Sequence, residues 1–225
     1  MKKWCTILGI LIFTLAGCQS SHKTAQSANL EGVQTESTQN NSERQPSESA
    51  LEHEVIINEK VYSFRLDDYP ILSKYVHNFH DPLKKFQSLT FKPIHEDLYV
   101  VTFACHQNKC STLLLDLKKG ASFLLSDLSA LVDQQLSIDE AFASFLFERK
   151  RENGTNIHQL LVIDLQTMQP VSLELDNDDN LIPRPNQYQY EIQSVTFKNN
   201  QLLIVSSDPS SITKNTWLET TWTYK

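Results

Sequence analysis

The chain has 225 residues, of which 20 are Lys or Arg and 27 are Asp or Glu, and its formal net charge at pH 7 is −7. An acidic chain repels the phosphates of nucleic acids, so we expect no nucleic-acid partner. It repels anionic lipid headgroups as well, so its charged surface alone is not expected to hold it at a membrane.

The first 18 residues have the pattern of a targeting segment. Two lysines precede an apolar run from Ile7 to Leu15, which is much shorter than the about 20 residues that a membrane-spanning helix needs. The run ends in Leu15-Ala16-Gly17-Cys18, which resembles the lipobox of bacterial lipoproteins. The resemblance implies that residues 1–17 are a signal peptide. It also implies that Cys18 is lipidated and becomes the first residue of the mature protein.

The same resemblance implies where the protein is located. Several acyl chains on Cys18 would anchor it stably in the lipid bilayer, which a single chain would not. Gln19 stands where an Asp tends to retain lipoproteins in the inner membrane. In a bacterium with two membranes we therefore expect the outer membrane, with the protein facing the periplasm. From Gln19 to about Ala50 the chain is rich in Ser, Gln, Asn, Thr and Glu, so residues 18–50 are predicted to be a lipidated, disordered tether.

Residues 51–225 predict a single, mainly β domain with antiparallel strands. Alternating and continuous apolar runs mark strands at 54–57, 60–66, 89–94, 98–105, 111–117, 122–125, 142–148, 159–165, 171–175, 192–197, 202–205 and 217–224. Asp67-Asp68-Tyr69-Pro70 and Asp81-Pro82 have the chemistry of helix starts, which predicts short helices near residues 70–87. Ser126 or Asp127 predicts another short helix near residues 127–135.

Two cysteines remain in the predicted domain, Cys105 and Cys110, on either side of a four-residue connection between apolar strands. We expect them to form a disulfide across the hairpin in an oxidising compartment, the alternative being half of a metal site without a second pair. If the two cysteines face each other, Val101 shares a face with Leu114, and Val100 shares the other face with Leu113. Both faces are apolar, so these strands are predicted to be covered on both sides.

A weak repeat relates two of the predicted strands. The segment Leu113–Leu117 aligns with Leu161–Leu165, and their aspartates, Asp116 and Asp164, are 48 residues apart. This spacing and pattern are typical of β-propeller blades. Three such units are fewer than a closed propeller needs. The sequence therefore predicts blade-like antiparallel sheets, either as an incomplete propeller-like arrangement or as a two-sheet sandwich.

Several local patterns resemble known functional sites. Asp176–Asn180 starts like a calcium loop but lacks the required Gly and Glu, so a solvated acidic loop is the better interpretation. His77, His80 and Asp81 are interpreted as a helix-to-helix corner, and Ser211-Ile212-Thr213-Lys214 as a chance match to S-x-x-K. We therefore expect no catalytic residue, no metal site and no cofactor.

Near the C-terminus lie Trp217, Trp222 and Tyr224, for which core packing is the preferred interpretation and partner binding is the alternative. Trp217 and Trp222 are separated by an odd number of residues, so on one strand they point to opposite faces. The leading hypothesis is a membrane-anchored, non-enzymatic binding module that contacts another envelope protein. The alternatives are a toxin-immunity or inhibitor lipoprotein and a cell-wall or glycan-directed hydrolase. The hydrolase would pair carboxylates such as Asp116, Glu148 and Asp164.

Overall fold

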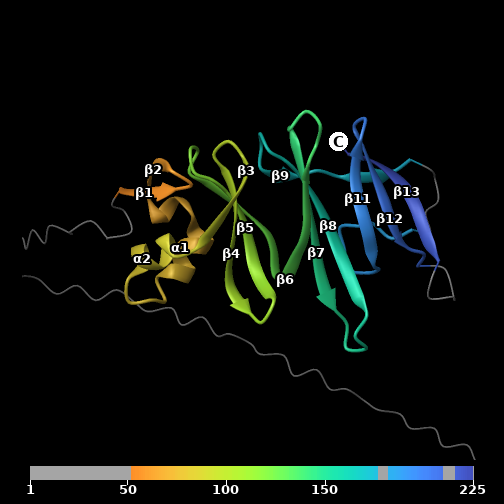
Figure 1. The fold of residues 1–225 in the computed structure, drawn as a ribbon, viewed down its shortest axis with the longest axis horizontal. Coiled ribbons are helices and arrows are strands. Elements are labelled where there is room, and N and C mark those ends of the chain that lie inside the picture. Colours follow the sequence, from red (N-terminus) through yellow and green to blue (C-terminus); the bar gives the residue numbers. More distant parts are fainter. Residues whose placement is uncertain (1–51, 177–181, 210–215, 225) are drawn as a thin grey trace, which may run out of the picture. The chain divides into compact units, whose positions relative to one another are not determined.

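A computed structural model describes residues 52–176, 182–209 and 216–224 (Figure 1). Its helices are short: a 3-10 turn η2 (Leu66–Asp68), α1 (Pro70–Val76) and α2 (Pro82–Gln87). The strands are β1 (His53–Ile57), β2 (Lys60–Phe64), β3 (Thr90–His95), β4 (Leu98–His106), β5 (Lys109–Asp116), β6 (Ala121–Leu136), β7 (Phe142–Lys150), β8 (Asn156–Asp164), β9 (Gln169–Pro170), β10 (Leu173–Leu175), β11 (Ile192–Lys198), β12 (Gln201–Ser207) and β13 (Trp217–Tyr224). The domain is mainly β, as predicted.

The N-terminal elements follow from local sequence chemistry. β1 and β2 form the predicted hairpin, and both residues of its turn, Asn58 and Glu59, have left-handed φ values of 49° and 67°. Two left-handed residues give a turn whose twist matches that of the strands. The N-cap of α2 is Asp81, whose side chain accepts the N–H of Lys84 at 2.9 Å, and Pro82 occupies the first turn. The helices predicted near residues 70–87 are confirmed.

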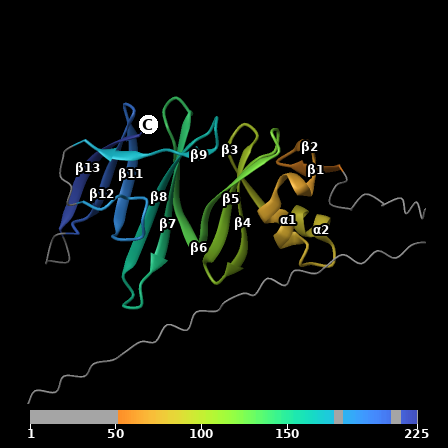
Figure 2. The ribbon, with the colours of Figure 1, turned by 180° about the vertical axis from the view of Figure 1, so that it is seen from behind.

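The remaining strands form antiparallel sheets, and β6 belongs to two layers. Residues 121–129 of β6 pair with β5, and residues 130–136 pair with β7. One layer is therefore β3-β4-β5-β6 and the next is β6-β7-β8-β9, while a separate sheet has the order β10-β13-β12-β11. Figures 1 and 2 show these groups from opposite sides. Among the described strands no sheet closes into a barrel, so the prediction of open, antiparallel sheets is confirmed, and the arrangement is consistent with a sandwich.

Three apolar cores lie between the layers. The first joins the β1–β2 hairpin and the helices to one face of β4 and β5. The second lies between β4–β5 and β7–β8, and the third lies between β7–β8 and the last sheet. Val101 contributes to the first core and Val100 to the second, so β4 is covered on both faces as predicted. Burial on both sides explains the nearly continuous apolar sequence of these strands.

The helix predicted near residues 127–135 is wrong, because these residues belong to β6. Ser126 does not cap a helix. Its hydroxyl forms a hydrogen bond with the hydroxyl of Tyr188 at 2.9 Å and accepts one from the hydroxyl of Ser129 at 2.7 Å. Leu131 pairs with Phe147 on β7. The helix signals are local, whereas the pairing with β5 and β7 comes from segments distant in sequence and outweighs them.

The disulfide Cys105–Cys110 is confirmed, but the faces predicted from it are wrong for β5. Val101 pairs with Leu113, and Val100 pairs with Leu114. The register shifts between Phe103 and His106, where Ala104 has a left-handed φ of 49°. This bulge inserts one extra residue on β4, and a slip of one residue moves every side chain of the partner strand to the other face.

Candidate functional site

A hollow with a volume of about 690 Å³ lies where four turns meet. Its lining comes from four places: the β3–β4 turn (residues 95–98), the β5–β6 turn (Asp116, Lys118 and Lys119), the β6–β7 loop with the first residue of β7 (residues 140–142), and the β8–β9 turn (residues 164–166). The volume lies in the range of small-molecule and side-chain pockets. The hollow is therefore the first place to look for a binding site.

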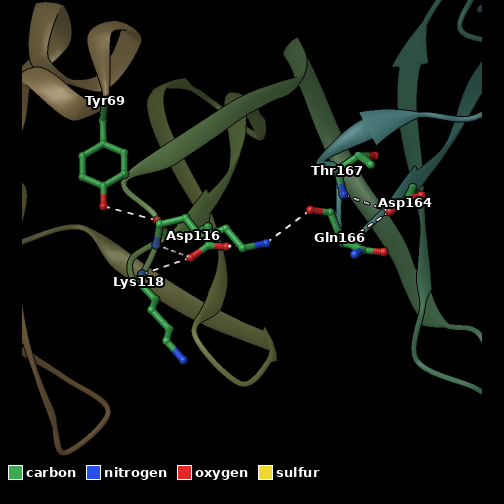
Figure 3. Close-up of polar contacts among 7 residues, drawn as sticks. Tyr69, Asp116, Lys118, Asp164, Gln166 and Thr167 are labelled. Carbon is green, nitrogen blue, oxygen red and sulfur yellow. Dashed lines mark hydrogen bonds and ion pairs between the residues drawn. The ribbon is translucent and has the colours of Figure 1, made fainter.

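Two aspartates of the predicted repeat build equivalent turns in this hollow (Figure 3). Asp116, the last residue of β5, is 4% exposed, and its Oδ1 accepts the N–H groups of Lys118 at 3.0 Å and Lys119 at 2.8 Å. Asp164, the last residue of β8, accepts those of Gln166 at 2.8 Å and Thr167 at 3.0 Å in the same way. Each carboxylate replaces the backbone partners that the chain loses where a strand ends.

Lys119 connects the two turns across the hollow. Its Nζ donates to the carbonyl oxygen of Gln166 at 3.2 Å and lies 3.5 Å from Oδ2 of Asp116. The lysine side chain is 56% exposed, so solvent screens this ion pair and its contribution to stability is small. Its role is to place a positive charge between two turns that are 48 residues apart in sequence.

The other ionisable groups of the hollow belong to the β3–β4 turn and the β6–β7 loop. His95 Nδ1 lies 3.1 Å from Oε2 of Glu140, which joins the turn to the loop. Asp97 accepts the hydroxyl of Tyr62 at 2.9 Å, and this hydrogen bond is the main reason that the pKa of Asp97 is lowered. Leu98 and Leu165 are buried and contribute apolar surface. The lining of the hollow thus combines apolar and charged side chains.

The carboxylates proposed for a hydrolase are only partly brought together. Asp116 and Asp164 line the same hollow, but Oδ1 of each holds two backbone N–H groups. Glu148 does not line the hollow; its Oε2 lies 3.6 Å from Nε2 of His158. A retaining or inverting glycosidase needs two carboxyl groups that are free to act on the substrate. The geometry therefore assigns Asp116 and Asp164 a turn-forming role.

His158 is buried and links β8 to the last sheet. Its Nδ1 accepts the N–H of Ile192 at 3.0 Å, so in the neutral ring the proton is on Nε2, which faces Glu148. Burial is the main cause that lowers the pKa of His158, while Glu148 and Glu191 act in the opposite direction. Protonation of Nδ1 would remove the acceptor for Ile192.

A second hollow, of about 270 Å³, lies on the other side of the β6–β7 loop. Ile138 and Asp139 of the loop line it together with Tyr224 and residues 197–200. The ring of Tyr224 packs against Phe142 with centroids 4.9 Å apart and against Phe197 at 5.6 Å. Tyr224 is thus both a packing residue and part of a hollow.

The structure separates the roles of the three C-terminal aromatic residues. Trp222 is 2% exposed, lies in the third core and donates its Nε1–H to Thr220 at 2.9 Å. Trp217 pairs with Ser207 on the opposite face of β13 and is 45% exposed. The prediction that the two tryptophans point to opposite faces is confirmed. Of the two, Trp217 alone is accessible to a partner.

The remaining motif assignments have simple outcomes. His80-Asp81-Pro82 forms the predicted corner between α1 and α2. Residues 177–180 of the acidic loop and the Ser211–Lys214 match lie outside the described residues. In the part of the chain that the structure describes, no three His, Cys, Asp or Glu side chains gather as a metal site would require. Within the same residues, no helix is long and apolar enough to cross a bilayer.

Sequence reasoning missed His95, Lys119, Ile138 and Glu140 as parts of one surface. Their turns are distant in sequence, and no single motif joins them. The aspartate repeat was the available signal: aligning the residues after Asp116 and Asp164 would have shown two equivalent turns. Comparison of the chain with protein-family models and with curated protein sequences finds no match.

Proposed function

We propose that this protein is a membrane-anchored lipoprotein that acts as a non-enzymatic binding module in the bacterial envelope. Cys18 attaches it to the bilayer, residues 18–50 act as a tether, and the sheet domain contacts another envelope protein. Localisation to the outer membrane facing the periplasm is part of the proposal for a bacterium with two membranes.

The binding role is supported by how the acidic residues of the 690 Å³ hollow are used. One oxygen of Asp116 and one of Asp164 each accept two backbone N–H groups, and Asp97 accepts a hydrogen bond from the hydroxyl of Tyr62. Such carboxylates shape a rigid, charged surface, which is what a binding site needs. A catalytic pair would instead need groups free to exchange protons or attack a substrate.

The proposed lipid attachment at Cys18 is tested by metabolic labelling with a palmitate analogue. We expect the wild-type protein to be labelled and to fractionate with the envelope, and Cys18→Ser to lose both properties. Cys5→Ser is the matched control, because Cys5 would leave with the signal peptide and its replacement should change neither result. Labelling of the Cys18→Ser protein, or its retention in the envelope, would refute the lipoprotein assignment.

The binding role is tested by mild cross-linking in intact envelopes followed by purification of the full-length protein. We expect one protein to be recovered in stoichiometric amount with the wild type. Repeated recovery of the protein alone would contradict a binding module. An inhibitor or immunity function would appear as a secreted enzyme or toxin among the recovered proteins.

One observation favours a glycan-directed hydrolase as the second candidate, namely that Asp116 and Asp164 line the same hollow. The purified protein would then release soluble fragments from peptidoglycan, and Asp164→Asn would abolish the release. The binding module is expected to release none with either protein.

A further inference from the structure

The β6–β7 loop, residues 137–141, is held rigidly between the two hollows. The N–H of Ser137 donates to the carbonyl of Phe142 at 2.9 Å, and the N–H of Phe142 donates back to Oγ of Ser137 at 2.9 Å. The hydroxyl of Ser137 in turn donates to Asp139 at 2.6 Å, a hydrogen bond that is the main cause of the lowered pKa of Asp139. The carbonyl of Ala141 accepts the N–H of Leu165, which fixes the loop to β8.

This rigid loop exposes an isoleucine. Ile138 is 82% exposed, more than any other large apolar side chain in the described part of the chain. The next residue but one, Glu140, has a left-handed φ of 56°, which is unfavourable for a residue other than glycine. Several internal hydrogen bonds hold this loop while it presents an apolar side chain to water. Such preorganisation lowers the cost of binding a partner.

The hollows on either side define what the surface can accept. The larger one contains five carboxylates, from Glu96, Asp97, Asp116, Glu140 and Asp164, against two lysines. Leu98 and Leu165, which also line this hollow, are buried and add apolar surface to its lining. An apolar stem that ends in a positive charge matches this combination, and Lys and Arg side chains have that form. The smaller hollow, lined by Phe197 and Tyr224, offers aromatic surface beside Ile138.

We propose that this end of the domain docks a protein partner that inserts a Lys or Arg side chain into the larger hollow and packs apolar residues against Ile138. The inference rests on the proposed binding function and names the surface and the chemistry of the partner. Charge complementarity favours a basic protein segment over an acidic one, because the hollow and the whole chain, with a net charge of −7, are both acidic.

The test uses the full chain and two fluorescein-labelled peptides, Gly-Arg-Ile-Lys-Gly and its counterpart Gly-Glu-Ile-Glu-Gly, with binding followed by fluorescence anisotropy. We expect saturable binding of the basic peptide with a Kd below about 1 mM and none of the acidic peptide. Ile138→Ser and Glu96→Gln are each expected to weaken binding about tenfold, and binding should weaken as salt is added.

Each variant has a matched control elsewhere on the surface. Leu128→Ser removes an apolar side chain that is 55% exposed, and Glu152→Gln removes an exposed acid from the β7–β8 turn. Neither control should change the affinity. Equal weakening by the controls, equal binding of the acidic peptide, or no saturable binding of the basic peptide would overturn the proposal.

The same variants separate this inference from the proposed function. If the wild type, Ile138→Ser and Leu128→Ser all cross-link a partner equally, the proposed docking surface is refuted while the proposed binding function is supported. If the basic peptide binds as expected but the wild type captures no envelope protein, the surface recognises basic chains and the proposed envelope role is wrong.

Discussion

Replacing Asp116 with alanine is expected to lower the free energy of unfolding by about 3 kcal/mol. Asp116 is 4% exposed, and its carboxylate accepts two backbone N–H groups at 3.0 and 2.8 Å. Each hydrogen bond to a charged acceptor contributes at least about 1.5 kcal/mol. For a domain of this size, the loss corresponds to a fall in Tm of about 6–12 °C. Asp116→Asn keeps the accepting oxygen and should lose about half as much.

Asp164→Ala is the matched comparison, because Asp164 makes the same two hydrogen bonds from a half-buried position. Water can replace its contacts, so the expected loss is about 1–2 kcal/mol. Urea denaturation followed by far-UV circular dichroism measures all three variants, and an unchanged m value shows that the comparison is valid. An Asp116→Ala protein as stable as the wild type, or more stable, would refute the turn-forming role and would point to a carboxylate kept for chemistry.

Three further predictions concern the rest of the domain. The pKa of His158 is lowered below its unfolded value near 6.5, so its neutral form contributes stability above about pH 6.5. This stability is lost as the pH falls through the lower folded pKa. His158→Gln should therefore reduce the dependence of the urea midpoint on pH between about 7.5 and 5. In the same assay, Trp222→Ala should lower the free energy of unfolding by about 3–5 kcal/mol and Trp217→Ala by less than about 0.5 kcal/mol. Equal losses would contradict the different burial of the two side chains. Reduction of Cys105–Cys110 should cost about 2 kcal/mol, as seen in a lower Tm with reductant, and a Cys105→Ser, Cys110→Ser double variant should not respond to it.

Much of the local structure could be predicted because its causes are local. Asn58 and Glu59 specify the first hairpin, Asp81-Pro82 begins α2, and the Cys105–Cys110 spacing predicts the disulfide. Burial on both faces could also be predicted, since Leu98–Val101 of β4 and Leu113–Leu115 of β5 are continuous apolar runs. Each of these features depends on a few neighbouring residues whose conformational preferences agree.

The candidate site could be predicted only in fragments. Asp116 and Asp164 were recognisable as a repeat, but that they line one hollow depends on β6 leaving one layer for the next. Ile138 resembles any other apolar residue in the sequence. Its exposure follows from the position of its loop between two hollows, which only the packed layers define.

The sequence by itself determined the turns, the caps, the disulfide and the alternation of apolar residues, because these depend on interactions between residues close in the chain. The tertiary structure decided that residues 121–136 form a strand. It also decided that Leu113 packs in the first core and Leu114 in the second. In both cases the deciding energy comes from hydrogen bonds and burial with distant strands, and one bulged residue at Ala104 is enough to reverse the faces of β5.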